Sequence, residues 1–276
     1  MHDLYRKDKN GNNTFDTIIN NVIAIKHREY VGCAATLTNR VFSLADTIEY
    51  LSTIFNTLSF RLCRSPIYGL TDVSLEKWEN EYSKLAKRLR NDINNSNLKI
   101  FKCLMNGDDL FGRYLCRMFG NSRTINRCDG SITRFTCDMD GKIYGCPASS
   151  GINGFEIEKD DIFEHSMSEL KRQANQCLGC PFKYYCGGEC KLETSCCGDT
   201  NKYNCEFKKH LIKLSAYLKI YCLRNNLNMY KCLNQFCNEK KARNRIDPEL
   251  RAFCDSHPNL TFIEAKRKFD KTIKRY

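Results

Sequence analysis

The chain lacks any apolar run long enough to cross a membrane. A transmembrane helix needs about 20 consecutive, mostly apolar residues, and no stretch of the 276 residues approaches that length. The first seven residues, MHDLYRK, are too polar to predict a secretory signal peptide. Internal repeats and low-complexity tracts are also absent. We therefore expect a cytoplasmic protein with no membrane partner, in a compartment that keeps thiols reduced.

Cysteine, in contrast, is abundant, with 18 in the chain. A hydrophobic content of 42% and a charged content of 28% are ordinary for a globular protein. A chain of this length can build one large or two modest cores, so it needs no disulfide scaffold. Without export the thiols would stay reduced. Disulfides remain the alternative, and the composition favours metal ligation.

Eight of the cysteines form one spaced series, and its centre is the fourteen-residue segment CLGCPFKYYCGGEC at 177–190. Packing alone does not require four soft ligands in one short loop. Eight thiolates divide into two sets of four, and a 4Fe–4S cluster normally takes four cysteines. Zinc is the alternative occupant, because zinc sites also use C-x2-C pairs. The series consists of Cys128, Cys137, Cys146, Cys177, Cys180, Cys186, Cys190 and Cys205.

The formal net charge of +12 raises the question of a nucleic-acid partner. Two clusters, each bringing a net charge of about −2, would reduce this excess to about +8. Much of the remainder lies in the basic segment 240–276, which fits a solvated helix face as well as a binding surface. The sequence shows neither interleaved aromatic residues nor a recognition module for nucleic acid. We therefore do not expect nucleic-acid binding.

Residues 1–120 alternate between helical and strand patterns. Strands are predicted near 30–37 and 58–63, with a helix near 43–56 between them. Thr14 is predicted to cap an earlier helix with the apolar set Phe15, Ile18, Ile19, Val22 and Ile23. Ser74 is predicted to open a longer helix with one apolar face formed by Trp78, Tyr82, Leu85 and Leu89. This pattern indicates βα units on a parallel sheet, too few to close a barrel.

Residues 121–222 carry the cysteine series and little regular structure. The segment 135–146 predicts a β-hairpin with its turn at Asp140-Gly141, which would bring Cys137 and Cys146 to one cluster. Ser166 and Glu169 predict a capping box for a short helix. The two glycines after Cys186 are expected to provide backbone turns that a Cβ would block.

Residues 223–276 form a basic extension. It contains Cys232, Cys237, Cys254 and His257, which could bind a structural zinc ion or could be scattered side chains with no shared role. The spacing of these four residues matches no strong zinc motif.

The cysteine series resembles the SPASM domain, the auxiliary-cluster module that follows the catalytic barrel of many radical S-adenosylmethionine (radical SAM) maturases. Twelve residues separate Cys128 from Gly141, and Gly141 opens the G-x4-C of Cys146. The central C-x2-C-x5-C-x3-C matches the family spacing without a slip. The resemblance implies one cluster held by Cys128, Cys137, Cys146 and Cys190, and a second held by Cys177, Cys180, Cys186 and Cys205. Cys196 and Cys197 compete with Cys205 for the last position.

The first 120 residues are similar to the latter part of a radical SAM barrel. The segment HDLYR at 2–6, followed by GNNTFD at 11–16, resembles one that these maturases carry after the fourth barrel strand. The resemblance implies that Arg6 could contact the carboxylate of S-adenosylmethionine, and a solvated arginine is the alternative. We expect an α/β fold with an irregular cysteine-rich module. The expected regions are a partial radical SAM (β/α) barrel at 1–120, a SPASM domain with two auxiliary clusters at 121–222 and a basic extension at 223–276.

The radical-generating C-x3-C-x2-C triplet of this family is missing. Cys186 and Cys190 have the first spacing, but Glu193 stands where the third cysteine would be. The resemblance therefore implies that the first three βα units are absent and that the chain alone cannot cleave S-adenosylmethionine reductively. Either the chain is a truncated product or a separate chain supplies the missing half. S-adenosylmethionine is expected as a cofactor only in the second case.

The resemblance also bears on the substrate. In some sulfatase-maturing relatives, an aspartate directly after the third cysteine of the first auxiliary cluster removes a proton from the substrate. Pro147 stands at that position here. The expected substrate is a ribosomally made peptide or protein that undergoes another modification, such as crosslinking. The alternatives are a non-catalytic electron carrier, a substrate-binding protein, or a zinc-binding interaction protein. The cysteines outside the series are expected in the core, represented by Cys33, Cys63, Cys103, Cys116 and Cys222.

Overall fold

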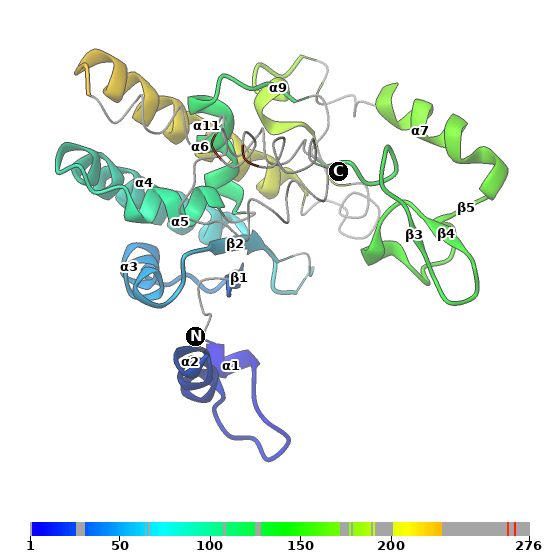
Figure 1. The fold of residues 1–276 in the computed structure, drawn as a ribbon, viewed down its shortest axis with the longest axis horizontal. Helices are drawn as coiled ribbons and strands as arrows, with labels where there is room; N and C mark the ends of the chain where they lie inside the picture. The colour runs from blue at the N-terminus through cyan, green and yellow to red at the C-terminus, as the bar shows by residue number, and fades with distance from the viewer. Residues whose placement is uncertain are drawn as a thin grey trace.

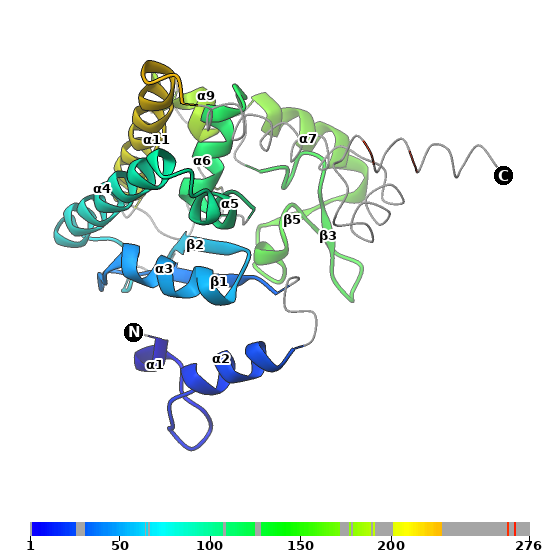
Figure 2. The same ribbon diagram turned by 60° about the vertical axis from the view of Figure 1, so that its left-hand side comes forward.

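The computed structural model describes residues 2–25, 31–63, 65, 67–106, 109–124, 128–171, 177, 179–188, 190, 201–227, 264 and 268. Figure 1 and Figure 2 show a helical body built around a short sheet, with the cysteine-rich region beside it. The α1–α2 pair lies on one side of this sheet, and α5 and α6 lie on the other. None of the described helices has both the length and the apolar character needed to span a membrane.

The sheet of the helical body is a single parallel β-α-β unit. Strand β1 (Cys33–Leu37) pairs with β2 (Leu58–Leu62), and the helix α3 (Leu44–Ile54) connects them. Leu37, Leu58 and Phe60 are buried on one face of the sheet, whereas Ala34, Thr36 and Arg61 on the other face are exposed. The predicted strands and crossover helix are therefore confirmed. In the described part of the chain, the two strands of this sheet do not close into a barrel.

The long helix α4 (Asp72–Asn94) starts at a capping box. The Thr71 Oγ accepts from the Ser74 backbone N–H at 3.3 Å, and the Ser74 Oγ accepts from the Thr71 N–H at 2.8 Å. Ser74 is thus the third residue of the helix, so the predicted start was two residues too late. The predicted apolar face is confirmed, because Trp78, Tyr82 and the two leucines that follow are buried.

Asp109 joins the sheet to the next layer of helices. Its carboxylate accepts from the Phe60 N–H in β2 and from the Gly112 N–H in α6 (Leu110–Phe119), both at 2.7 Å. Full burial raises the pKa of this carboxyl to about 6, against the opposing effect of those hydrogen bonds. Helix α5 (Lys99–Asn106) packs closely on α6 at Gly112, where a Cβ would lie 2.0 Å from the Leu104 carbonyl oxygen.

Helix α11 (Asn201–Arg224) packs across α4 and α6 and closes the helical body. Its buried stripe includes the apolar residues Phe207, Leu211 and Leu218. The Tyr82 ring meets the Phe207 ring edge-on at 5.2 Å between centroids. Although α11 follows the cysteine loop in the chain, it therefore shares one core with the N-terminal β-α-β unit.

The N-terminal helices form a small unit held by one carboxylate. Helix α1 (His2–Tyr5) places Asp3 so that its Oδ1 accepts from the Thr14 and Phe15 N–H groups, both at 2.9 Å. Helix α2 (Phe15–Ala24) thus starts where predicted, but Asp3 rather than the Thr14 side chain supplies the cap. Of its predicted apolar set, Ile19 and Val22 are buried, whereas the two remaining isoleucines are largely exposed.

The cysteine-rich region contains a three-stranded antiparallel sheet. Strands β3 (Thr136–Cys137), β4 (Ile143–Tyr144) and β5 (Glu156–Ile157) lie in chain order. The hairpin between β3 and β4 was predicted correctly, and Gly141 in its turn has φ +82°, a conformation that favours glycine. Two 3₁₀ turns, η2 (Pro147–Ser149) and η3 (Lys159–Asp161), follow β4 and β5.

Helix α7 (Ile162–Lys171) follows η3 and begins four residues before Ser166. The predicted capping box at Ser166 is therefore wrong. The Ser166 Oγ instead donates to the Ile132 carbonyl at 2.9 Å and ties α7 to the turn after Cys128.

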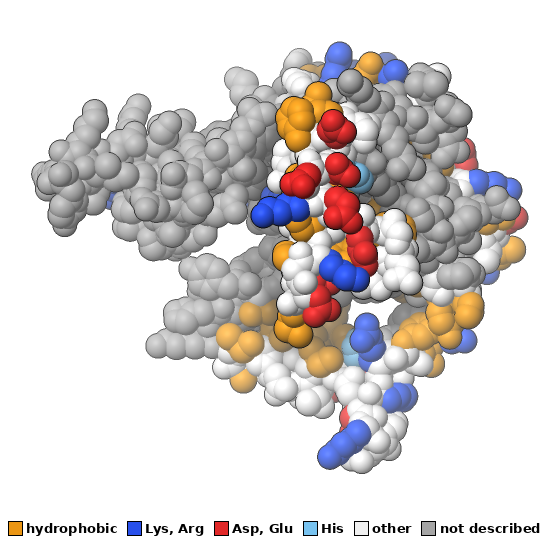
Figure 3. Space-filling view, turned by 90° about the vertical axis from the view of Figure 1, so that its right-hand side faces the viewer, with side chains coloured by type: hydrophobic (Ala, Val, Ile, Leu, Met, Phe, Trp, Pro, Cys, Tyr) orange, Lys and Arg blue, Asp and Glu red, His pale blue; other side chains and the backbone are white. Residues whose placement is uncertain are grey.

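The surface of this region is acidic, although the chain as a whole is basic. Figure 3 shows acidic side chains gathered on this side of the molecule. The exposed acidic residues of β5, η3 and their flanks are Glu156, Glu158, Asp160, Asp161 and Glu164.

Candidate metal centre

The central cysteine loop is shaped by one short helix and two glycines. Helix α9 (Lys183–Cys186) ends at Gly187 with φ +76°, and Gly188 follows with φ +80°. Both residues therefore occupy left-handed backbone conformations, as the sequence predicted. A Cβ on Gly188 would meet nothing within 4 Å, so the requirement there is conformational rather than a lack of space.

The loop is docked on the helical body by backbone contacts. The Arg117 guanidinium in α6 donates to the carbonyls of Tyr185 and Cys186, the latter at 3.1 Å. The Thr124 N–H donates to the Tyr184 carbonyl at 2.8 Å. Phe182 packs against the core of the body. These contacts fix the loop relative to α6 and α11.

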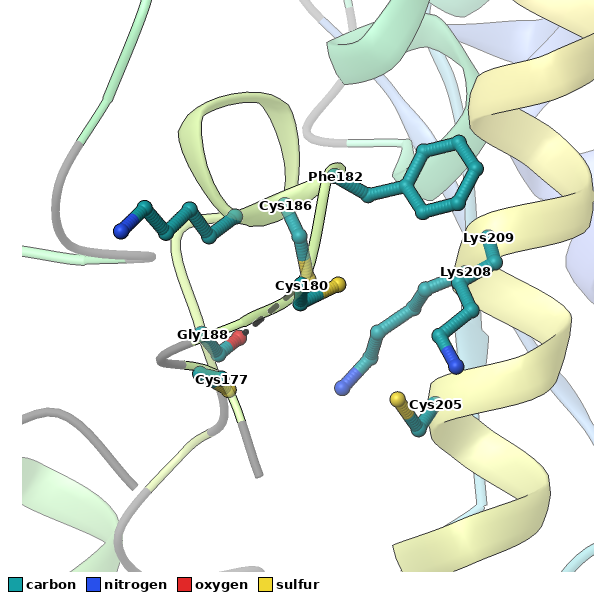
Figure 4. Close-up of a pocket in the computed structure, with 9 residues that line it drawn as sticks. Cys177, Cys180, Phe182, Cys186, Gly188, Cys205, Lys208 and Lys209 are labelled. Atoms are coloured by element: carbon teal, nitrogen blue, oxygen red, sulfur yellow. Dashed lines mark hydrogen bonds between the residues drawn. The ribbon is translucent and has the colours of Figure 1, made fainter. Parts of the chain in front are cut away.

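Four predicted ligands line one pocket between this loop and α11. Cys177, Cys180 and Cys186 come from the loop, and Cys205 comes from the first turns of α11. Figure 4 shows the four sulfur atoms on the walls of this space, facing one another across it. Cys190 is not among the residues that line the pocket. The grouping coincides with the set of four that the SPASM resemblance implies.

Cationic side chains border the same pocket. Lys208 and Lys209 line it from α11, and Lys183 lines it from the loop. Lys209 donates to Glu206 at 2.7 Å. This hydrogen bond is the main cause of its raised pKa, and negative charge at Cys205 and Cys180 adds to the effect. The pocket therefore combines four thiols with positively charged side chains, and this charge favours an anionic occupant.

Four cysteine thiols are a donor set that either a 4Fe–4S cluster or a tetrahedral zinc ion takes. In the described part of the chain, no group of three or more His, Cys, Asp or Glu side chains is gathered closely enough to hold a single metal ion. The chemistry of the donor set is therefore compatible with both occupants.

The other set of cysteines is partly assembled. A Cβ on Gly130 would lie 3.6 Å from the Cys128 sulfur and 3.9 Å from the Cys146 Cβ, so these two cysteines flank one point. The turn that holds them is tight, because a Cβ on Gly145 would lie 1.6 Å from the Ser131 Oγ. The Ser131 N–H donates to the Gly145 carbonyl at 2.7 Å.

Cys137 lies farther along the hairpin than the sequence suggested. It is exposed and stands opposite Ile143, whereas Cys146 lies two residues beyond the end of β4. Three residues of strand correspond to about 10 Å along the hairpin. The hairpin thus forms as predicted without placing Cys137 directly across from Cys146. Cys190 is half-buried.

The remaining predicted residues have varied positions. Arg6 is exposed after α1, its N–H donating to the His2 carbonyl at 3.0 Å. Cys103 and Cys222 are buried as expected, and burial raises the pKa of the Cys222 thiol to about 11. Cys33, Cys63 and Cys116 are half-buried. Six residues named in the sequence predictions lie outside the described part of the chain: Cys196, Cys197, Cys232, Cys237, Cys254 and His257.

Lys208 was missed by the sequence analysis, although a signal for it exists. Phe207 and Leu211 mark the buried stripe of α11, and Lys208 falls on the same stripe at helical spacing. Lys208 follows the predicted ligand Cys205 by three residues and lies on the apolar face of the helix. This placement indicates that its amine lies near the predicted site. Arg117 gave no comparable signal, because its partners are backbone carbonyls far along the chain.

No family model matches the sequence, and no curated protein matches it significantly.

Proposed function

We propose that this chain is an iron–sulfur protein that corresponds to the C-terminal portion of a radical SAM/SPASM maturase. The observation that carries the proposal is the pocket lined by Cys177, Cys180, Cys186 and Cys205. Three of these cysteines belong to a loop whose spacing is typical of the SPASM domain. The fourth comes from a helix that the loop reaches only through the tertiary fold.

In this proposal, the four thiolates hold a 4Fe–4S cluster that can accept or pass on an electron. The thiolate ligands fix its position, and Arg117 holds their loop against α6. Lys208 and Lys209 offset its negative charge. Cys128, Cys137, Cys146 and Cys190 are proposed to hold a second cluster, for which Cys128 and Cys146 already lie close together.

Radical generation is assigned to a part of the enzyme that lies outside these 276 residues. The sequence has no C-x3-C-x2-C triplet, and the described part of the chain contains one β-α-β unit rather than a barrel. S-adenosylmethionine would therefore bind only together with the part of the enzyme that carries this triplet, and Arg6 is the proposed contact from these residues. The proposed substrate is a ribosomally made peptide or protein in the cytoplasm, where thiols remain reduced.

Metal analysis tests the proposal. The full chain is reconstituted anaerobically with iron and sulfide, and iron, sulfide and zinc are quantified together with the visible spectrum. We expect about eight irons and eight sulfides per chain with thiolate-to-iron absorption. A colourless protein that binds zinc and no iron would overturn the proposal and favour the zinc-binding interaction protein.

The second candidate is an electron carrier or substrate-binding protein that uses the same clusters without a radical partner. It is favoured by the one β-α-β unit found among the residues that the structure describes and by the exposed position of Arg6. Incubation of the reconstituted chain with S-adenosylmethionine and a strong reductant distinguishes an enzyme from a carrier. Formation of 5′-deoxyadenosine by the chain alone would contradict both candidates. The first assigns radical generation to residues outside this chain, and the second involves no radical chemistry.

A further inference from the structure

Lys208 occupies an unusual position for a lysine. Its side chain is 1% exposed, and it lines the pocket that Cys177, Cys180, Cys186 and Cys205 form. Lysine is almost never fully buried unless its charge is compensated. The residue therefore places its amine among four sulfur ligands and not in solvent, as Figure 4 shows.

The position follows from the geometry of α11. Cys205 and Lys208 are three residues apart, and side chains at this spacing lie on neighbouring parts of a helix surface. Phe207 and Leu211 are buried beside Lys208 and anchor this part of the helix in the core. The backbone that carries Lys208 is thus fixed by packing that is independent of the cysteine loop.

Lys209 provides an internal comparison. It lines the same pocket, but its side chain is 30% exposed and is paired with Glu206 at 2.7 Å. Solvent screens its charge because its side chain is partly exposed. A buried ammonium acts through a lower effective dielectric constant and is screened much less. Of the two lysines, Lys208 is therefore the one whose charge acts most strongly on the pocket.

We propose that the positive charge of Lys208 raises the reduction potential of the cluster bound by Cys177, Cys180, Cys186 and Cys205. This inference rests on the proposed function. One-electron reduction, with dithionite as the donor, changes the net charge of a cluster with four thiolates from about −2 to about −3. A fixed positive charge beside the ligands stabilises the reduced form more than the oxidised form. Lys208 therefore makes this cluster easier to reduce than an equivalent cluster without the charge.

The test is a redox titration of the anaerobically reconstituted full chain, followed by electron paramagnetic resonance. Cys205→Ser identifies which signal belongs to this cluster. Lys208→Met is expected to lower the reduced-to-oxidised ratio at fixed potential at least tenfold, a shift of about 59 mV for a one-electron couple. Lys208→Arg keeps the charge and is expected to stay close to wild type. Lys208→Gln provides a second neutral side chain if the Met variant does not fold.

Two controls isolate the charge effect. Lys209→Met removes a screened charge from the same pocket and is expected to shift the potential less than Lys208→Met does. Lys9→Met removes an exposed charge from the loop between α1 and α2, on the opposite side of the molecule from α9, and should shift neither signal. Iron in the wild type with an unchanged potential in both neutral Lys208 variants would overturn this inference and leave the proposed function standing. A wild-type chain without iron would overturn both.

Discussion

Arg117 on α6 donates a hydrogen bond to the carbonyl of Cys186 in the central cysteine loop, with 3.1 Å between Nη1 and O. The same Nη1 also donates to the Tyr185 carbonyl. One guanidinium thus connects a helix of the N-terminal body to a loop almost 70 residues later in the chain. The position of three proposed ligands depends on this contact as well as on local turns.

Replacing Arg117 should therefore loosen the loop. Hydrogen bonds from charged donors contribute about 1.5–3 kcal/mol each, so Arg117→Met is expected to lower the free energy of unfolding by at least about 1.5 kcal/mol. It should also reduce iron bound at the Cys177–Cys205 pocket. Chemical denaturation and iron analysis of the same preparations measure both effects. Arg117→Lys, which keeps a charged donor but not the forked guanidinium, should give an intermediate result. Full iron loading in Arg117→Met would contradict the proposed role.

Substitution of the two cysteines on α11 should have different effects on iron content and on stability. Cys205 lines the pocket, whereas Cys222 is fully buried in the hydrophobic core. Cys205→Ser is expected to reduce the iron content from about eight to about four per chain, because one of the two proposed clusters would lose a ligand. Cys222→Ala should keep all the iron and should lower the free energy of unfolding by about 1 kcal/mol, the cost of a small cavity.

Comparison of these two variants distinguishes ligation from packing, since both remove a thiol from the same helix. Iron loss from both would indicate that the helix itself had been disrupted. Unchanged iron in Cys205→Ser would point to Cys196 or Cys197 as the fourth ligand.

Asp109 should make stability depend on pH in the weakly acidic range. Burial raises the pKa of its carboxyl from 3.8 to about 6 in the folded protein. The folded state therefore binds this proton more tightly than the unfolded state does. Protonation of Asp109 thus stabilises the folded state, and this contribution is fully present below about pH 3.8. This effect is lost as pH rises through about 6, and it amounts to about 3 kcal/mol.

Asp109→Asn tests this dependence. The variant has no carboxyl group to titrate, so its free energy of unfolding should change less than that of wild type between pH 4 and pH 7. Near pH 4 it should lose about 1–3 kcal/mol relative to wild type, because the amide nitrogen cannot accept one of the two backbone hydrogen bonds, and this loss should shrink as the pH rises and the wild-type carboxyl ionises. Denaturant titrations across this range provide the measurement. Parallel curves for the two proteins would rule out Asp109 as the titrating group.

The local parts of the structure could be predicted from the sequence. Trp78 and Tyr82 lie four residues apart on one apolar face, and this period alone predicted α4 and its burial. Asp140-Gly141 predicted the hairpin, because its turn needs a left-handed residue. The spacing of the central cysteines did not predict the pocket by itself, because Cys190 belongs to that spacing and does not line the pocket; the SPASM resemblance implied the grouping of Cys177, Cys180 and Cys186 with Cys205.

The parts that escaped prediction depend on contacts distant in the chain. Thr14 looked like the cap of α2, but the N–H groups of Thr14 and Phe15 at the start of this helix donate to Asp3, eleven and twelve residues earlier in the chain. Ser166 fitted a capping box, yet its hydroxyl bonds to Ile132 across the cysteine-rich region. Periodicity and turn chemistry describe neighbours in the chain, so they cannot identify a partner that only tertiary folding supplies.

Gly145 should be essential for the placement of Cys128 and Cys146. A Cβ at this position would lie 1.6 Å from the Ser131 Oγ and 2.8 Å from the Ser131 Cβ, so Gly145→Ala must displace the turn that brings the two cysteines together. We expect this variant to lose iron from the first proposed cluster while the second remains loaded. Gly154→Ala is the matched control. Its φ is +83° and nothing lies within 4 Å of the new Cβ, so it should cost only about 1–2 kcal/mol and keep the iron.

The clash at Gly145 also predicts its own suppressor. Ser131 has φ +63°, which is unfavourable for any residue with a Cβ. Ser131→Gly removes both the hydroxyl and the Cβ that the new alanine would meet, and it relieves the strained backbone. The double variant Gly145→Ala/Ser131→Gly should therefore recover iron that Gly145→Ala loses. A double-mutant cycle on iron content and unfolding free energy should give a favourable coupling between the two positions. If the effects are additive, the close contact between these residues does not control the site, and the first cluster must be positioned by other parts of the chain.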